Sequence, residues 1–328
     1  MTRLIFAKNS ALLTFTTMNK LFIILFFLPL AVGAKEGIFS ADSVLLKNHV
    51  YTITGTRSYR NIDDTATLNK TRSYIQQQLG KYAKEATLQT YTVNGKQYSN
   101  VIASYGPENA PRIIIGAHYD VCDEQAGADD NASGVAGLLE LARLLSKEDA
   151  SAWKYRIDLV AYTLEEPPSF KTSNMGSTVH AQYLADNHIP VLGMISLEMI
   201  GFYKDAKHTQ QYPLGFFKWF YGSRGNYITV VKKLHAGKFC RRFTRGFKHG
   251  DNIITKVFSA PKWVPGVDWS DHLSYWAKGW QALMITDTSF FRNANYHQKT
   301  DTPETLDYSR MSFVVTNLFN TLSKMAKG

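Results

Sequence analysis

Apolar residues are arranged along most of the chain in two alternating ways, as unbroken runs and as helical repeats. Four runs predict buried strands: RIIIGAH (112–118), YRIDLVAYTLEE (155–166), VLGMISLEMIGF (191–202) and WQALMITD (280–287). Repeats of three and four residues predict helices over 133–146, 175–186 and 309–328. Strands that alternate with helices favour a mixed α/β fold, in which helices cover both faces of a mainly parallel central sheet.

The region before the first of these strands predicts a helix followed by a β-hairpin. Apolar residues with helical spacing lie within 63–84. The segment 88–106 alternates around Asn94-Gly95, a pair typical of tight hairpin turns. Because no internal repeat and no Pro/Gly-rich linker interrupts the pattern, we expect one domain over residues 35–328.

The first 34 residues have the pattern of a secretory signal. Met18–Ala34 contains a lysine, an unbroken apolar run and then small residues, with Val32 and Ala34 placed for signal-peptidase cleavage. The apolar run is shorter than the ~20 residues of a membrane span, which favours cleavage over an uncleaved anchor. We predict a signal peptide over 1–34, with Met18 as an alternative start, and a secreted or periplasmic protein without stable membrane insertion.

The composition is that of a large globular domain and does not point to a nucleic-acid partner. Hydrophobic residues make up 45% of the 328 residues, enough for a sizeable core. The net charge of +10 falls to +7 without the leader, since 34 basic and 27 acidic residues then remain. We interpret Lys and Arg as spread along the chain, apart from short clusters such as 240–250, and we find no clustered groove signature for nucleic acid.

Acidic and histidine residues gather where the predicted strands end. They are His118, Asp120, Asp129, Asp130, Glu165, Glu166, Glu198, Asp271, His272 and His297. Ligands of open α/β sheets bind beyond the carboxyl ends of the strands, so one pocket would collect these side chains from distant segments. Unpaired, so many buried carboxylates would repel one another, and we infer that positive charge lies among them.

Imidazole and carboxylate donors without a nearby cysteine pair are typical ligands of a catalytic zinc ion or a similar divalent cation. The donors are too numerous for one tetrahedral zinc ion that keeps an open position. They suit two ions ~3.5–4 Å apart that share one carboxylate. We therefore expect two Zn²⁺ ions per chain.

Each motif also has a plain structural interpretation. Residues 129–134, DDNASG, would suit the cap of a helix, because Asp, Asn and Ser are favoured capping residues. LEEPP (164–168) would suit a solvated turn that ends a strand. HQKTDTPETLDYSRM (297–311) would suit a polar loop before a helix capped by Asp307 or Ser309. A helix cap, a turn or a loop explains each motif alone, but these interpretations do not explain why all the motifs lie at strand ends.

As a set, these motifs resemble those of the secreted co-catalytic dizinc aminopeptidases. That family includes the bacterial leucyl aminopeptidases and relatives of glutamate carboxypeptidase II, within the MH clan of zinc exopeptidases. The resemblance covers about residues 100–311 and rests on GAHYD, GADDNASG, LEEPP, SLEMIGF, SDH and NYHQKTDTPETLDY. The region before residue 100 carries none of these motifs.

The resemblance implies a role for each matching residue. His118, Asp130, Glu166, Glu198 and His297 match the zinc ligands, with Asp130 as the bridging carboxylate, followed in the family by a cis peptide bond. Glu165 matches the general base, and Asp120 matches the carboxylate that orients the His118 imidazole. Tyr296 is a candidate donor to the reaction oxyanion, with a packing role as the alternative. Glu165 and Glu166 can serve separate roles because strand alternation is expected to aim them apart, and which residue has which role is taken from the family.

We therefore expect a zinc-dependent exopeptidase, most simply an aminopeptidase that hydrolyses peptide substrates. Two alternatives are a glutaminyl cyclase-type aminoacyltransferase with one zinc ion and a binding domain that has lost the chemistry. The sequence leaves open whether Cys122 and Cys240 pair, and whether Asp271 and His272 support the site. It also leaves open whether Arg224 lies at the pocket rim or in solvent.

Overall fold

Eight strands form one mixed sheet in the computed structural model, which describes residues 39–250 and 252–328. The strands are β1 (Ala86–Val93), β2 (Lys96–Tyr105), β3 (Arg112–His118), β4 (Arg156–Tyr162), β5 (Val191–Glu198), β6 (Ile228–Lys233), β7 (Thr255–Ala260) and β8 (Ala282–Thr286). Their order across the sheet is β1-β2-β4-β3-β5-β8-β6-β7. The predicted signal peptide over 1–34 lies outside the described residues, so it stays a prediction.

The four strands predicted from apolar runs are the parallel centre of this sheet. β3 pairs in parallel with β4 and with β5, and β5 pairs in parallel with β8. The β1–β2 hairpin is antiparallel, turns at Asn94-Gly95 as predicted, and joins β4. β6 runs antiparallel to β8 and parallel to β7, which extends the sheet on the far side. The predicted mixed α/β fold with a mainly parallel sheet is confirmed.

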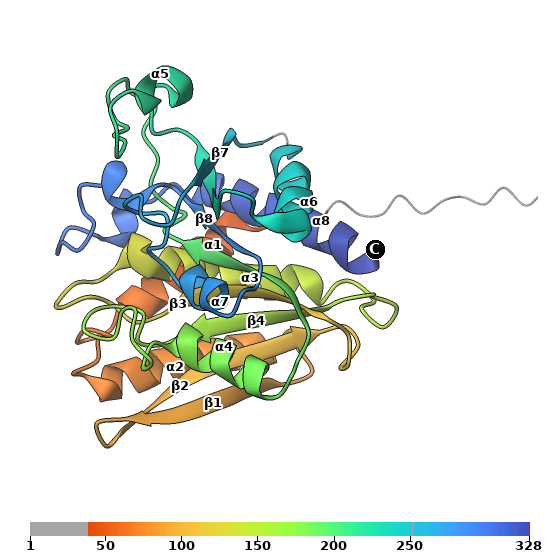
Figure 1. Ribbon diagram of the computed structural model, residues 1–328. Helices are drawn as coiled ribbons and strands as arrows, with labels where there is room; N and C mark the ends of the chain where they lie inside the picture. The colour runs from red at the N-terminus through yellow and green to blue at the C-terminus, as the bar shows by residue number, and fades with distance from the viewer. Residues whose placement is uncertain (1–38, 251) are drawn as a thin grey trace, which may run out of the picture. The chain divides into compact units, whose positions relative to one another are not determined.

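Helices cover both faces of the sheet (Figure 1). One face carries α1 (Ser43–Thr54), α2 (Thr65–Gly80), α3 (Gly134–Leu145), α6 (Gly237–Lys248) and α8 (Tyr308–Lys327). The other carries α4 (Gly176–Asp186) and α7 (His272–Ala277). The short helix α5 (Phe217–Tyr221) lies beyond the sheet, next to β7. No helix within the described ranges combines the length and apolar character of a membrane span.

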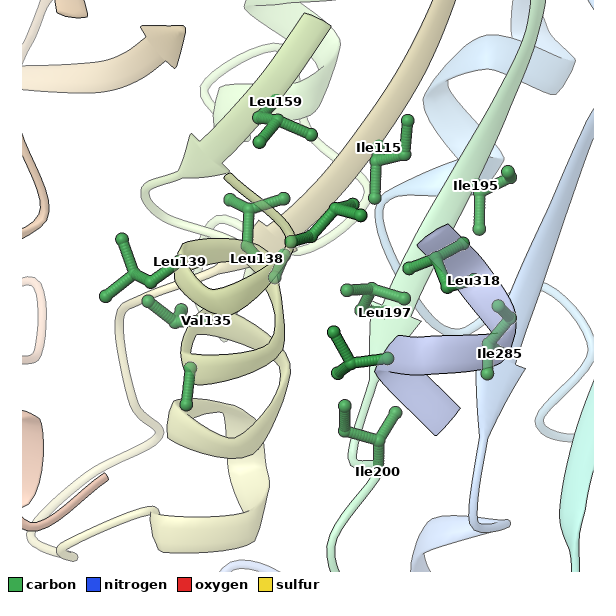
Figure 2. Close-up of a cluster of buried hydrophobic side chains, with 14 of the residues drawn as sticks. Ile115, Val135, Leu138, Leu139, Leu159, Ile195, Leu197, Ile200, Ile285 and Leu318 are labelled. Atoms are coloured by element: carbon green, nitrogen blue, oxygen red, sulfur yellow. The ribbon is translucent and has the colours of Figure 1, made fainter. Parts of the chain in front are cut away.

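The core is a direct result of strand alternation. In β3, Ile113 and Ile115 face α3 and α8, whereas Ile114 faces the α4 side. Figure 2 shows Ile115 of β3 and Leu197 of β5 next to residues of α3 and α8 in this cluster. Because side chains on both faces of the central strands are buried, those strands read as continuous apolar runs.

The predicted helices are present with small shifts at their ends. α2 begins at Thr65 because Asp64 accepts the N–H of Thr67, two residues later than we predicted. α8 is capped by Asp307, which accepts the N–H of Arg310. We had assigned no element over Lys204–Trp269, where the structure has α5, β6, α6 and β7.

Candidate metal centre

Asp130 lies between two histidines, His118 and His297, that are far apart in the sequence. Its Oδ1 is 3.3 Å from Nε2 of His118, at the end of β3. Its Oδ2 is 3.2 Å from Nε2 of His297, in the loop after the 3-10 helix η2 (Ser289–Phe291). One carboxylate therefore presents one oxygen to each imidazole, which is the arrangement expected of a bridging ligand.

A second carboxylate approaches each histidine. Oε2 of Glu198, the last residue of β5, is 3.4 Å from Nε2 of His118. Oε2 of Glu166 is 3.4 Å from Nε2 of His297. The structure thus brings together all five predicted metal ligands, in two groups that share Asp130.

Ser270 fixes the orientation of the Glu198 carboxylate. Its hydroxyl donates to Oε2 of Glu198 at 2.7 Å and lies 2.6 Å from the hydroxyl of Ser196. All three residues are buried. We had noted the SDH motif that begins at Ser270 but had given this serine no role.

Glu165 and Glu166 lie in a loop rather than in a strand. β4 ends at Tyr162, and Leu164 then has a φ of 57°, which turns the chain out of the sheet. Our explanation that strand alternation aims the two glutamates apart is therefore wrong. Both side chains are buried, so the alternative of a solvated turn is wrong as well. Oε2 of Glu165 lies 3.9 Å from Nε2 of His118.

Asp120 holds this loop in place. Its Oδ1 accepts the N–H of Glu165 and its Oδ2 accepts the N–H of Glu166, both at 3.1 Å. Nδ1 of His118 is 3.6 Å from Oδ1 of Asp120, which is beyond hydrogen-bond distance. The predicted orienting carboxylate is thus next to His118, and its short hydrogen bonds go to the two glutamates.

The segment that carries Asp130 is bound to the rest of the protein on several sides. It forms the π-helical turn η1 (Ala128–Ser133), and the Asp130–Asn131 peptide bond is cis, as the resemblance implies. Oδ1 of Asn131 accepts the N–H of Met199, directly after Glu198. The helix-cap interpretation of this motif is confirmed only in part: Oδ1 of Asn131 also accepts the N–H of Gly134, the first residue of α3, whereas Ser133 makes no capping hydrogen bond.

Two residues that we had not singled out support η1. The carboxylate of Asp301 accepts the backbone N–H groups of Asp129 and Asp130 at 3.0–3.2 Å. The buried guanidinium of Arg60 donates to the carbonyl oxygens of Tyr119, Ala126 and Gly127. Arg60 comes from the region before residue 100, where the family motifs gave no signal.

Burial and mutual repulsion shift the ionisation of the clustered acids. Burial, followed by the charge of Asp130, raises the pKa of Glu166 to about 7. Burial raises the pKa of Glu165 well above its usual range. Burial opposes the charge on His297, but its contacts with Asp130 and Glu166 raise its pKa to about 10. The protein therefore retains protons in this cluster at pH values where exposed groups would have lost them.

This donor set fits a divalent zinc ion. Donor atoms of His118, Asp130 and Glu198 all lie within 4.8 Å of one another, and so do those of His118, Glu165 and Glu166. Within the described ranges, buried Oε1 of Glu166 has no hydrogen-bond partner, and Nε2 of His297 approaches Asp130 at 3.2 Å without the geometry of a hydrogen bond. Nitrogen and carboxylate donors that face one another with free lone pairs are what zinc requires.

The structure places the three residues whose relation to the site the sequence left open: Arg224, Asp271 and His272. Arg224 is exposed and donates to the carbonyl oxygen of Asp205, so it lies in solvent. Nε2 of His272 is 2.8 Å from the carbonyl oxygen of Val267, as in a structural histidine. Burial raises the pKa of the adjacent Asp271 to about 7.

The two cysteines are free thiols. Cys122 Sγ lies within 4.8 Å of donor atoms of Glu166 and His297. Cys240 is buried in α6, where its sulfur faces the carbonyl oxygen of Ala282. Burial, together with the charges of Glu166 and Asp123, raises the pKa of the Cys122 thiol to about 12.

An apolar cavity of about 370 Å³ opens onto the acidic cluster. Asp130, Glu165, Glu166, Glu198 and His297 form its polar end. Its walls come mainly from residues 204–269, where we predicted no element, and from β8. They include Tyr212, Tyr221, Tyr227, Thr229, Val231, Phe258, Trp269, Met284 and Phe290. Tyr296 also lines the cavity, and its ring stacks on His297 with centroids 3.8 Å apart.

Residues 100–321 match the model of Peptidase family M28. YfbL of Escherichia coli (strain K12), described as uncharacterized, is 39% identical over 307 residues, which are 91% of this chain and 93% of YfbL. A probable leucine aminopeptidase of Arthroderma otae is 25% identical over 244 residues, which are 70% of this chain and 58% of that protein.

Two solved structures show the same fold at low sequence identity. The LapA aminopeptidase of Legionella pneumophila has a TM-score of 0.68 at 19% identity, over 88% of this chain and 73% of LapA. The glutaminyl cyclase of Bacteroides thetaiotaomicron has a TM-score of 0.63 at 18% identity, over 86% of this chain and 98% of the cyclase. Peptidases and cyclases thus share this fold, and the fold by itself does not distinguish the two activities.

Proposed function

The chain belongs to peptidase family M28, and from this premise we propose that it is a zinc-dependent exopeptidase that removes N-terminal residues from peptides. The observation that carries the proposal is the position of Asp130, whose two oxygens lie 3.3 and 3.2 Å from the two imidazoles. A structural zinc site has no need of a shared carboxylate, whereas a two-ion hydrolytic site does. The similarity to leucine aminopeptidases supports the same class of activity.

Two groups of ligands would hold the metal. His118, Asp130 and Glu198 would hold one zinc ion, and Asp130, Glu166 and His297 would hold the other. Zinc ions bound there would supply an acidified water molecule and polarise the scissile carbonyl group. The charge of two divalent ions would also offset the carboxylates that otherwise repel one another.

Glu165 is the proposed general base. It lines the cavity and is not among the five proposed ligands, so its carboxylate faces the space in which a substrate would lie. Its Oε takes a proton from the attacking water and passes it to the nitrogen of the leaving amine. Burial raises the pKa of Glu165, which makes its carboxylate a better proton acceptor near neutral pH.

The cavity provides the remaining recognition. Carboxylate oxygens such as those of Glu165 line the polar end of the cavity, and a free N-terminal amine offers them more N–H donors than a blocked N-terminus does. The aromatic and aliphatic walls favour a bulky apolar first side chain. Tyr296 lines the cavity and is the proposed donor to the oxyanion, held in place by its stacking on His297.

We also propose that the protein acts outside the cytoplasm, because the first 34 residues have the pattern of a signal peptide. The mature chain would begin near residue 35. The mass of the protein recovered from the extracytoplasmic fraction tests this, since a retained leader would contradict it.

Zinc analysis together with a peptide panel tests the proposed activity. We expect two zinc ions per chain, release of the first residue from peptides with a free N-terminus, and no release from N-acetylated peptides. One zinc ion per chain with cyclisation of N-terminal glutamine would instead indicate a glutaminyl cyclase. Bound zinc without turnover of any peptide would indicate a binding domain.

A further inference from the structure

The segment around α5 exposes an unusual group of large apolar side chains. Trp219 is 88% exposed, Phe220 77%, Phe216 51% and Leu214 50%. We call residues 214–220 the aromatic tip. In Figure 1 it is at the top of the view, beyond β7, and none of its residues lines the cavity. Apolar side chains gathered in this way mark a surface that binds a partner.

The base of the aromatic tip is firmly held. Phe217 packs edge-on against Phe258 of β7 with ring centroids 5.1 Å apart. The hydroxyl of Tyr221 donates to the carbonyl oxygen of Val257 at 3.0 Å. The exposed side chains therefore stand on an anchored segment, and their exposure is a property of the fold.

The stretch of sequence that contains the aromatic tip carries the excess positive charge of the chain. Residues 204–262 contain thirteen Lys and Arg and two Asp, for a net charge of +11. The rest of the chain contains 24 basic and 25 acidic residues, for a net charge of −1. Five of the thirteen cations belong to α6, which Figure 1 shows apart from α5, so only part of this charge lies at the tip. Our interpretation of Lys and Arg as spread along the chain is thus wrong, because one segment carries the whole excess.

Several of these cations lie at or beside the aromatic tip. Lys218 is within it, and its Nζ is 3.3 Å from Nδ1 of His208. Lys207 is exposed next to His208 in the sequence. Asp205, the acid within residues 204–220, is paired with Arg310 through two contacts of 2.8 Å. The cations of the tip are therefore available to an anionic partner.

We propose that the aromatic tip docks the protein on an anionic phospholipid bilayer. Trp, Phe and Leu with neighbouring Lys are the residues that insert shallowly at a lipid–water interface, and Lys218 with the nearby Lys207 complements a negative surface. A projecting tip suits a deformable bilayer better than a protein partner, which needs about 800 Å² of complementary surface. The binding is peripheral and reversible, and no membrane span is involved.

Co-sedimentation with vesicles tests this proposal. The full chain should bind vesicles of phosphatidylcholine and phosphatidylglycerol, and bind phosphatidylcholine alone more weakly. Trp219→Ser/Phe220→Ser should weaken binding to the mixed vesicles at least about tenfold. Lys218→Glu should weaken binding to the mixed vesicles only, and added salt should weaken binding of the parent protein. Residues 1–38 are the same in all these proteins, so the difference between them reports on the tip.

The matched control removes exposed apolar side chains elsewhere. Val44 is 63% exposed in α1 and Tyr183 49% exposed in α4. Val44→Ser/Tyr183→Ser should bind vesicles as the parent does, and all variants should keep the parent's melting temperature. In vesicles with brominated lipid, Trp219→Phe should keep binding and lose most of the tryptophan quenching.

Three outcomes would overturn the proposal. The first is equal vesicle binding by the parent and Trp219→Ser/Phe220→Ser, and the second is no vesicle binding by the parent. The third is self-association of the parent that the double variant abolishes, without vesicle binding by either. That last result would assign the aromatic tip to a contact between two copies of the chain.

Discussion

The carboxylate of Asp301 accepts the backbone N–H of Asp130 at 3.0 Å, 171 residues away in the sequence. Asp301 also accepts the N–H of Asp129, and it lies four residues after His297. It therefore fixes the distance between the loop that carries one imidazole and the turn that carries the shared carboxylate. Neither partner is exposed, so water cannot replace the lost hydrogen bonds.

From this contact we expect Asp301→Asn to weaken zinc binding. The amide would present N–H groups where the carboxylate accepts, so at least one backbone N–H would lose its partner. Loss of such supporting contacts usually costs roughly 10–100-fold in metal affinity. Competition with a chromogenic chelator would measure it. Asp307→Asn, at the cap of α8, is the control and should keep the zinc affinity; an equal loss in both variants would point to general destabilisation.

Glu165→Gln should abolish peptide hydrolysis and leave the zinc content unchanged. The amide cannot accept the proton of the attacking water, and loss of a general base typically lowers kcat by about 10²–10⁴-fold. Steady-state kinetics and metal analysis on the same sample would show this. Glu124→Gln changes an exposed glutamate of the same charge and should keep full activity. Substantial turnover by Glu165→Gln would reject the proposed mechanism.

Thr229→Leu should narrow the range of accepted substrates. Thr229 is a buried residue of β6 on the cavity wall, so a larger side chain there takes up cavity volume. We expect kcat/KM to fall about tenfold or more for peptides with a bulky first residue. Peptides that begin with alanine should be cleaved almost as before. An equal loss for both classes would place the first side chain elsewhere.

The stability added by zinc should increase with pH. Without zinc, the folded protein holds extra protons, because Glu166 has its pKa raised from 4.5 to about 7 and His297 from 6.5 to about 10. Raised values in the folded state mean that the free energy of unfolding falls as pH rises, from about 4.5 to 7 through Glu166 and from about 6.5 to 10 through His297. Zinc must displace these protons, so its affinity rises over the same range.

Thermal unfolding at pH 5.5 and pH 8, with chelator and with zinc, would measure this. The melting temperature of the chelated protein should be lower at pH 8, and the gap to the zinc-loaded protein should be wider there. A gap that does not change with pH would contradict the ionisation that we assign to the cluster.

The sequence predicted the positions of the proposed ligands better than the contacts that hold them. Because parallel strands end at one edge, the apolar runs predicted that His118 and Glu198 lie at strand ends, where the structure has them. Asp301 and Arg60 could not be found in this way, since each acts through backbone groups brought close only by the fold. The turn after β4 was missed because Leu164 adopts a positive φ that no sequence pattern signals.

Within residues 204–269, where we predicted no element, the helix α6 has a pattern that could have been recognised. Phe239, Phe243 and Phe247 recur every four residues in α6 and are all buried, with Arg and Lys on the opposite side. We had read that stretch only as a cluster of charge. β6 buries four consecutive residues, Ile228 to Val231, but so short a run cannot be told from part of a buried helix by its pattern. β7 is harder to predict, because it lies at the edge of the sheet and fully buries only Ala260.

The strand order separates the proposed ligands from much of the cavity wall. The proposed ligands follow strands of the sheet's parallel centre, whereas β6, β7 and α5 form an extension beyond β8 that supplies much of the cavity wall and the aromatic tip. Under the two proposals above, substitutions, insertions or deletions in that outer piece would alter which peptides are accepted, and where the molecule resides, without displacing a single proposed ligand.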